Sequence, residues 1–439
     1  MRDILVTLIV FGSLPYIFKR PYYGAIIWIW ISVMNPHTQG WGFARTFPFA
    51  AIIAVTTLLA MLSKPKEIRF PDSPAVKVFL LFVLWMVITT AFSFYPEDNL
   101  TALNKVIKIM GMTLIIWMLV RTREEIEGVI WAVAISLGYY GVKGGIFTVQ
   151  TGGEFRVWGP AGTFIEGNNE IALALIMTVP LMLYVLRLVQ HKWWRRAIIA
   201  SAGLCALASL GSYSRGAAVA LAGMLVVLWL KSQRKVLLGS IMIMLIPLAL
   251  VFMPQQWHNR IDTIDNYEED ASAMGRINAW KMAFNLANDR PLVGGGFNIY
   301  DPFIFNRYAP NPEDIHAAHS IYFQVLGEHG YVGLLLYLLL YWLVWRDGAW
   351  ILRHARGVES LEWAAALARM VQVSIMGFLI GGAFLSLVYF DVPYYLMVAM
   401  VATRRLVHET LKAQHTVPAQ QDTVDEYLPE RQMAAGSGR

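Results

Sequence analysis

Long apolar segments recur along almost the whole chain, and only one polar interruption, at residues 254–318, is long. A helix needs about 20 apolar residues to cross a bilayer, and fewer where the membrane is thin or the segment is re-entrant. The pattern predicts an all-α polytopic membrane protein with about 12 transmembrane helices. The candidate spans, of which the first two and the last are short, are residues 3–18, 22–36, 45–62, 75–94, 102–120, 127–149, 169–189, 196–213, 216–230, 235–253, 330–345, 363–388 and 391–403.

The same pattern divides the chain into four parts. We expect N-terminal transmembrane helices at residues 1–253, a loop at 254–318, C-terminal transmembrane helices at 319–407 and a disordered cytoplasmic tail at 408–439. Apolar positions at helical spacing predict that the loop contains short helices, notably at residues 272–289, followed by a glycine-rich turn.

Clusters of lysine and arginine alternate with the apolar segments and predict the orientation of the chain. Such clusters stay on the cytoplasmic side of a membrane, so the loops between them face outward, which for a bacterial inner-membrane protein is the periplasm. The basic clusters are residues 64–69, 121–123, 191–196, 231–235, 352–356 and 403–405, and the outward segments are 93–99, 151–169, 211–216 and 254–318.

Composition supports the membrane assignment and excludes other classes. The chain has 439 residues, of which 57% are hydrophobic and only 15% charged, whereas charged residues are about a quarter of a soluble protein. Its net charge of +6 is spread over the connecting segments instead of forming one patch, which argues against nucleic acid as a partner. Cys205 is the only cysteine, so neither an internal disulfide nor a cysteine metal site is available.

Four cations on the predicted outward side could bind an anion. Arg215 lies at the edge of a span beside hydroxyl side chains, and Arg276, Arg156 and Lys143 lie in or near outward loops. Taken singly, each could be an interface anchor whose charged end reaches water. Together they make the outward side locally basic, although lysine and arginine usually stay on the cytoplasmic side. This predicts a polyanionic ligand at the membrane surface, most simply a lipid diphosphate.

Two histidines, His316 and His319, precede an apolar segment and would share one face of a helix. Imidazole transfers protons near neutral pH, so either histidine could be a general base, and a purely structural role stays open. The spacing does not match a zinc motif, and we expect neither a metal nor a cofactor. Asn168, Asn169 and Tyr213 could contact a sugar or an acceptor, although helix capping is the ordinary role of an asparagine that opens a helix.

Five segments carry a family resemblance. "SYSRGAAVAL", "GRINAWKMA" and "HSIYFQVLGEHGYVGLL", together with "GTFIEGNNEIALAL", resemble the O-antigen ligase and polymerase superfamily of bacterial envelope glycosyltransferases. The N-terminal "WIWISVMNPHTQGWGFA" is similar to the branch described as O-antigen or O-glycosylation ligases.

The resemblance implies a GT-C-like fold and a metal-independent, inverting glycosyl transfer. The donor would be a glycan on undecaprenyl diphosphate and the acceptor the lipid A core, with transfer on the periplasmic side. His319 matches the catalytic histidine of the family, and Arg215 and Arg276 match its arginines.

An O-antigen polymerase or a protein O-oligosaccharyltransferase would use the same donor. A lipid-linked glycan transporter is the alternative from another class, but it would need charge at the membrane midplane, and the charges here gather near the outer boundary. The oligomeric state stays open.

Overall fold

Helices form the whole regular structure in the residues described. The computed structural model describes residues 1–232, 234–252, 255 and 271–416. The part of the predicted loop from 256 to 270 and the tail from 417 lie outside the described residues. The α-helices are α1 (Arg2–Lys19), α2 (Tyr22–Ile29), α3 (Phe49–Ser63), α4 (Pro74–Ala91), α5 (Pro96–Leu119), α6 (Arg123–Gln150), α7 (Asn168–Leu188), α8 (Lys192–Leu210), α9 (Arg215–Lys231), α10 (Lys235–Phe252), α12 (Ala271–Asp289), α13 (Pro302–Tyr308), α14 (Ile321–His354), α15 (Glu362–Gly382) and α16 (Asp391–Thr416).

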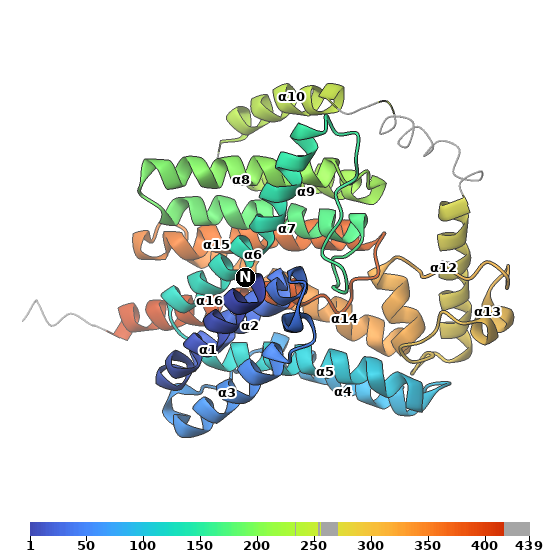
Figure 1. The fold of residues 1–439 in the computed structure, drawn as a ribbon. Coiled ribbons are helices and arrows are strands. Elements are labelled where there is room, and N and C mark those ends of the chain that lie inside the picture. Colours follow the sequence, from blue (N-terminus) through green and yellow to red (C-terminus); the bar gives the residue numbers. More distant parts are fainter. Residues whose placement is uncertain (233, 253–254, 256–270, 417–439) are drawn as a thin grey trace, which may run out of the picture.

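Most of these helices run along one common direction, whereas α12 crosses it at one end of the bundle (Figure 1). Six segments are long and apolar enough to cross a membrane: α4, α5, α6, α7, α14, and α15 with the turn before it. Backbone groups in a bilayer must be hydrogen-bonded within the protein, which helices achieve. The chain is therefore a multi-pass membrane protein of the predicted all-α class, while the count of about 12 spans stays a prediction.

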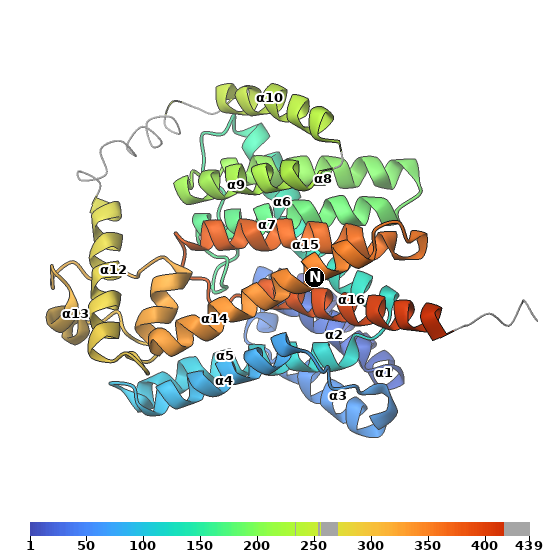
Figure 2. The same cartoon turned by 180° about the vertical axis from the view of Figure 1, so that it is seen from behind.

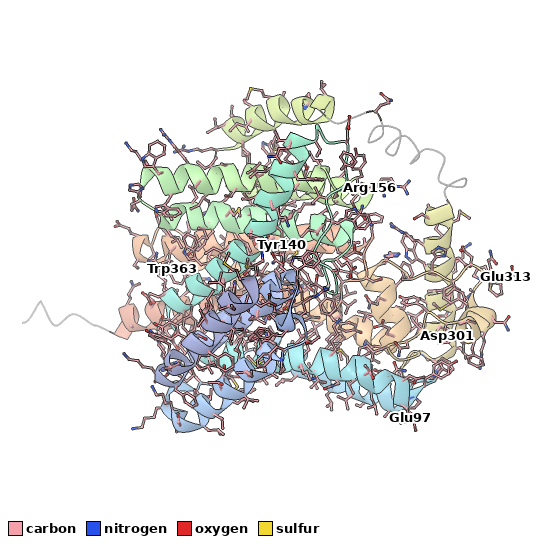
Figure 3. The ribbon with its side chains drawn as sticks, viewed as in Figure 1. Glu97, Tyr140, Arg156, Asp301, Glu313 and Trp363 are labelled. Atoms are coloured by element: carbon pink, nitrogen blue, oxygen red, sulfur yellow. The ribbon has the colours of Figure 1, made fainter. Side chains whose placement is uncertain are left out.

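The two ends of the bundle differ in charge. The α7–α8 and α14–α15 connections carry predicted basic clusters, and both lie at the end opposite α12 and α13 (Figure 2). Figure 3 places Trp363 at this basic end, and Asp301 and Glu313 at the other. The alternation of basic and outward segments in the sequence thus corresponds to two ends of one bundle.

Helix α14 begins earlier than the sequence predicts and contains a kink. The predicted span starts at residue 330, whereas α14 starts at Ile321, and Gly330 has non-helical dihedral angles (φ 67°) inside it. A side chain at this position would approach the Leu292 carbonyl oxygen to 2.5 Å. The segment "GEHGYVG" is therefore a sharp bend between two helical segments, and only glycine fits it without strain.

The glycine-rich turn after α12 replaces the hydrogen bonds that the kink interrupts. The N–H groups of Gly295 and Gly296 donate to the carbonyls of Gly327 and Glu328 at 2.8 and 2.9 Å. In the other direction, Tyr331 N–H donates to the Pro291 carbonyl at 2.8 Å. Backbone polar groups at a break in a helix need such partners. The turn therefore fixes the α12–α13 segment onto α14.

A buried polar cluster braces the same region and was not predicted. The His329 ring bonds to Thr89 Oγ1 on α4 through Nδ1 at 2.7 Å, and to Tyr389 Oη, in the α15–α16 connection, through Nε2 at 2.6 Å. Tyr389 also donates to the Glu328 carboxylate, which accepts from Gln324 Nε2 at 3.1 Å. Buried polar groups that bond in this way hold their helices in one arrangement.

Replacing Gly330 by alanine should destabilise the protein. The substitution combines a left-handed backbone angle with contact against a fixed backbone oxygen, and we expect the free energy of unfolding to fall by about 2 kcal/mol or more. Cys205 is fully buried and is the only cysteine, so its reaction with a thiol-specific dye during heating reports unfolding. Gly111→Ala is the matched control, since no atom outside the backbone of its own helix lies within 4 Å of the added Cβ in the described residues. An unfolding temperature for Gly330→Ala equal to that of Gly111→Ala would contradict the role of the kink.

Candidate functional site

His319 occupies a strained position immediately before α14. Its φ of 42° lies in the left-handed region, which costs about 1–3 kcal/mol for a residue other than glycine. The preceding residue, Ala318, is fully buried, and its carbonyl accepts from Trp280 Nε1 on α12 at 2.6 Å. The Trp280 ring stacks on Phe323 of α14 with 5.2 Å between centroids. The strain is therefore maintained by contacts from both α12 and α14.

The surroundings of His319 favour its neutral form. Burial, together with the positive charge of Arg276 and the nearby His316, lowers its pKa from 6.5 to about 4. Its Nδ1 is buried and has no hydrogen-bond partner among the described residues. The imidazole is therefore unprotonated at neutral pH, as a general base must be before reaction.

His316 lies against α12 beside the same arginine. Its Nδ1 is 2.7 Å from Asp314 Oδ1, and its side chain is exposed. A Cβ added to Gly275 would lie 2.7 Å from the same nitrogen, so the missing side chain makes room for the imidazole. The two predicted histidines and Arg276 thus gather at one junction between α12 and α14.

The beginning of α7 joins this junction to the α8–α9 turn. Arg276 is within electrostatic range of the Glu170 carboxylate in the first turn of α7. Two residues earlier, Asn168 is buried, and its side-chain amide donates to the Ser212 carbonyl at 2.7 Å. Gly167, not Asn168, is the N-cap of the helix. Asn168 therefore links two elements instead of capping α7, and Asn169 beside it is half-buried.

The side of the candidate site opposite His319 is formed by the α8–α9 turn and the α6–α7 segment, with Tyr213, Arg215 and Arg156. Tyr213 is buried with φ 60°, and its hydroxyl donates to the Gly153 carbonyl, so this group already has a partner within the protein. The exposed Arg156 guanidinium lies 5.8 Å from the Tyr213 ring centroid. Arg215 is half-buried at the first position of α9. Figure 3 shows Arg156 on the segment between α6 and α7.

Lys143 is the predicted site residue with the least structural support. It is exposed on α6, about two turns before the end of that helix. Within the described residues no contact joins it to His319 or to the arginines.

A separate pocket of about 470 Å³ lies beside the tip of the α6–α7 segment. Its wall includes Lys105, Lys108 and His37, and the Lys105 ammonium lies 4.1 Å from the Phe164 ring centroid. The His37 pKa is lowered by burial. The segment between α6 and α7 thus contacts this pocket at its tip and the candidate site through Arg156, next to Asn168 at the start of α7.

Within the described residues, no group of three or more His, Cys, Asp or Glu side chains is arranged to hold a metal ion. The expected independence of metal stays a prediction that chelation can test.

The fold and this region define a multi-pass membrane protein with basic residues and an uncharged histidine beside α12. Residues 200–338 match the O-antigen ligase family model, and residues 1–190 match a family of unknown function, DUF5935. The first match includes Arg215, Arg276 and His319. The match over residues 200–338 supports membership of the O-antigen ligase superfamily and confirms the predicted resemblance. No curated protein matches the chain significantly.

The lowered pKa of His319 predicts a specific dependence of stability on pH. Between pH 6.5 and about 4 the unfolded chain binds a proton that the folded protein does not, so stability falls as the pH drops through this window. Above pH 6.5 His319 is unprotonated in both the folded and the unfolded chain, so its full contribution to the free energy of unfolding is present. We expect the loss of unfolding free energy from pH 7 to pH 5 to be smaller in His319→Ala than in the wild type.

The measurement is chemical unfolding of each protein in buffered detergent at several pH values. His191→Ala is the control, since this histidine is exposed at the basic end, and it should retain the pH dependence of the wild type. Equal slopes for His319→Ala and the wild type would show that His319 titrates alike in the folded and unfolded chain.

Proposed function

We propose that the protein is an O-antigen ligase that transfers a glycan from undecaprenyl diphosphate to a sugar hydroxyl of the lipid A core. The observation that carries the proposal is the neutral His319 beside Arg276, both within the segment that the O-antigen ligase model matches. The reaction would take place at the end of the bundle that carries α12 and α13. The basic clusters at the other end support an inner-membrane protein whose active site faces the periplasm.

In the proposed reaction His319 accepts the proton of the acceptor hydroxyl, and the acceptor oxygen attacks the anomeric carbon. The bond between that carbon and the diphosphate oxygen breaks, and the electron pair leaves with undecaprenyl diphosphate. One direct displacement inverts the anomeric configuration. Because Nδ1 of His319 is buried, Nε2 is the nitrogen that would act as the base.

Arginines would stabilise the charge that develops on the diphosphate. Arg276 and Arg215 are proposed as the principal contacts, because a guanidinium can bind phosphate oxygens through two parallel hydrogen bonds. The exposed Arg156 would extend this surface, and Lys143 would contribute only through longer-range attraction. Since Arg276 also disfavours a protonated His319, one residue would serve both the leaving group and the base.

The acceptor would approach from the side of the exposed His316. His316 is exposed and Asn169 is half-buried, and both carry polar groups suited to a sugar, whereas the Tyr213 hydroxyl and the Asn168 amide already bond to backbone carbonyls. We therefore assign His316 and Asn169 to acceptor contacts, and Tyr213 and Asn168 to positioning the loops around the site.

The proposed base predicts the activity of His319→Ala. In proteoliposomes with carrier-linked glycan and lipid A core, turnover should fall at least about 100-fold, the ordinary contribution of a general base. The wild type should retain its activity with a chelator present. Separate reactions offer carrier-linked repeat units or an acceptor protein in place of lipid A core. Product only on one of those acceptors would identify a polymerase or a protein O-oligosaccharyltransferase instead, and normal turnover by His319→Ala would refute the base.

The arginine geometry predicts that charge alone is insufficient at position 276. Arg276→Lys keeps the positive charge but loses the planar pair of donors, so kcat should fall about tenfold or more. Arg307→Lys is the control on the same end of the bundle, because Arg307 is exposed and pairs with Asp289 at 3.2 Å. Equal kcat values for Arg276→Lys and the wild type would exclude two-point binding of the diphosphate by Arg276.

A further inference from the structure

Two adjoining pockets lie at the basic end of the bundle, away from the candidate site. Each has a volume of about 360 Å³, and both are lined by Arg187 of α7, Lys231 of α9 and Arg369 of α15. Arg234 and Arg356 add to the walls, and Glu362 is the only acidic residue among the described residues that line them. We call this combined region the basic-end pocket.

The three shared cations converge from three different helices. Arg369 is half-buried and lies within electrostatic range of both Arg187 and Lys231. The positive-inside rule accounts for cations at this end of a membrane protein, but not for their convergence on one pocket. Like charges at short range repel each other, and the repulsion strengthens where burial excludes water. An anion between them would remove this cost.

Lys231 is held toward the pocket instead of extending into water. Its ammonium donates to Gln372 Oε1 at 2.5 Å and lies 4.7 Å from the Trp345 ring centroid. Gln372 is itself fully buried and fixed by a 3.0 Å bond from its Nε2 to the Trp345 carbonyl. The position of the lysine is therefore determined by the protein before any ligand arrives.

The remaining wall suggests what kind of anion fits. One of the two pockets is lined mainly by apolar side chains of α7, α9, α10 and α15, among them Leu183, Leu228 and Leu238. A free inorganic anion gains nothing from such a surface, whereas an acyl chain does. Basic pockets between helices on this side of a membrane are suited to phospholipid head groups.

We propose that the basic-end pocket binds an anionic phospholipid. Its phosphate lies among Arg187, Lys231 and Arg369, and an acyl chain follows the aliphatic wall. The site is independent of the proposed glycosyl transfer, because it lies at the opposite end of the bundle and shares no residue with the candidate site.

The test uses the full chain, purified and delipidated in neutral detergent, with phosphatidylglycerol as the probe. Native mass spectrometry measures the bound lipid, and dye labelling of Cys205 measures the unfolding temperature. Phosphatidylglycerol should bind and raise the unfolding temperature more than phosphatidylcholine does. Arg187→Gln and Arg369→Gln should each weaken binding about fivefold, equivalent to ~1 kcal/mol per cation.

Arg353→Gln is the matched control, because Arg353 is an exposed cation near the end of α14 and does not line either pocket. It should bind phosphatidylglycerol as the wild type does. Without lipid, Arg369→Gln should be at least as stable as the wild type, since it removes repulsion, and this separates loss of binding from damage to the fold.

Three results would overturn the proposal. Equal binding of phosphatidylcholine and phosphatidylglycerol would show that the cations do not select the head group. The same rise in unfolding temperature with inorganic phosphate alone would identify a site for a free anion. Equal weakening by Arg353→Gln would show that binding follows the general charge of this end and not the convergent cations.

Discussion

The exchange of backbone hydrogen bonds between the kink in α14 and the glycine-rich turn is the constraint on which the candidate site depends. Gly330 interrupts α14, and Gly295 and Gly296 supply donors to the carbonyls at the break. This exchange fixes α12 relative to the beginning of α14, and the bond from Trp280 to Ala318 then fixes the peptide before His319. A histidine at positive φ can persist only where its surroundings are determined in this way.

The same constraint explains why the candidate residues come from irregular segments. Within a bilayer the backbone must be helical, so turns and strained residues are confined to the ends of the helices or to places buried in protein. His319 and Tyr213, both at positive φ, lie at two such ends, and the first turn of α7 connects them through Asn168 and Glu170. The membrane helices thus act as a rigid frame, and the end of α7 relates one half of the region to the other.

The all-α membrane class could be predicted from the sequence, because long apolar segments favour membrane-spanning helices, while the count of about 12 spans stays a prediction. Helix α12 and the following turn were also predicted correctly from periodicity and glycine content. The kink within α14 could not be placed, since a glycine in an apolar segment is usually compatible with a continuous helix. The bracing of His329 by Thr89 and Tyr389 was missed for another reason, because it joins residues 240 and 60 positions apart. Of the candidate residues, His319, His316 and Arg276 are close in the structure. Lys143 is exposed on α6 without a contact to them among the described residues, because its position along the chain does not determine which way its side chain points.

Charge is used differently at the two ends of the bundle. Near the α12 end, Arg276 is within range of an acid, Glu170, and beside an imidazole that it helps to keep neutral, so its charge is partly balanced within the protein. At the basic end, the described residues that line the basic-end pocket include five cations and one acid, Glu362. The buried amide of Gln372 directs the Lys231 ammonium inward. A balanced cation can bind an anion that arrives and leaves in each catalytic cycle, because the site is stable when it is empty. Unbalanced, convergent cations favour a ligand that stays bound, and an anionic lipid with its chain along the aliphatic wall meets that requirement.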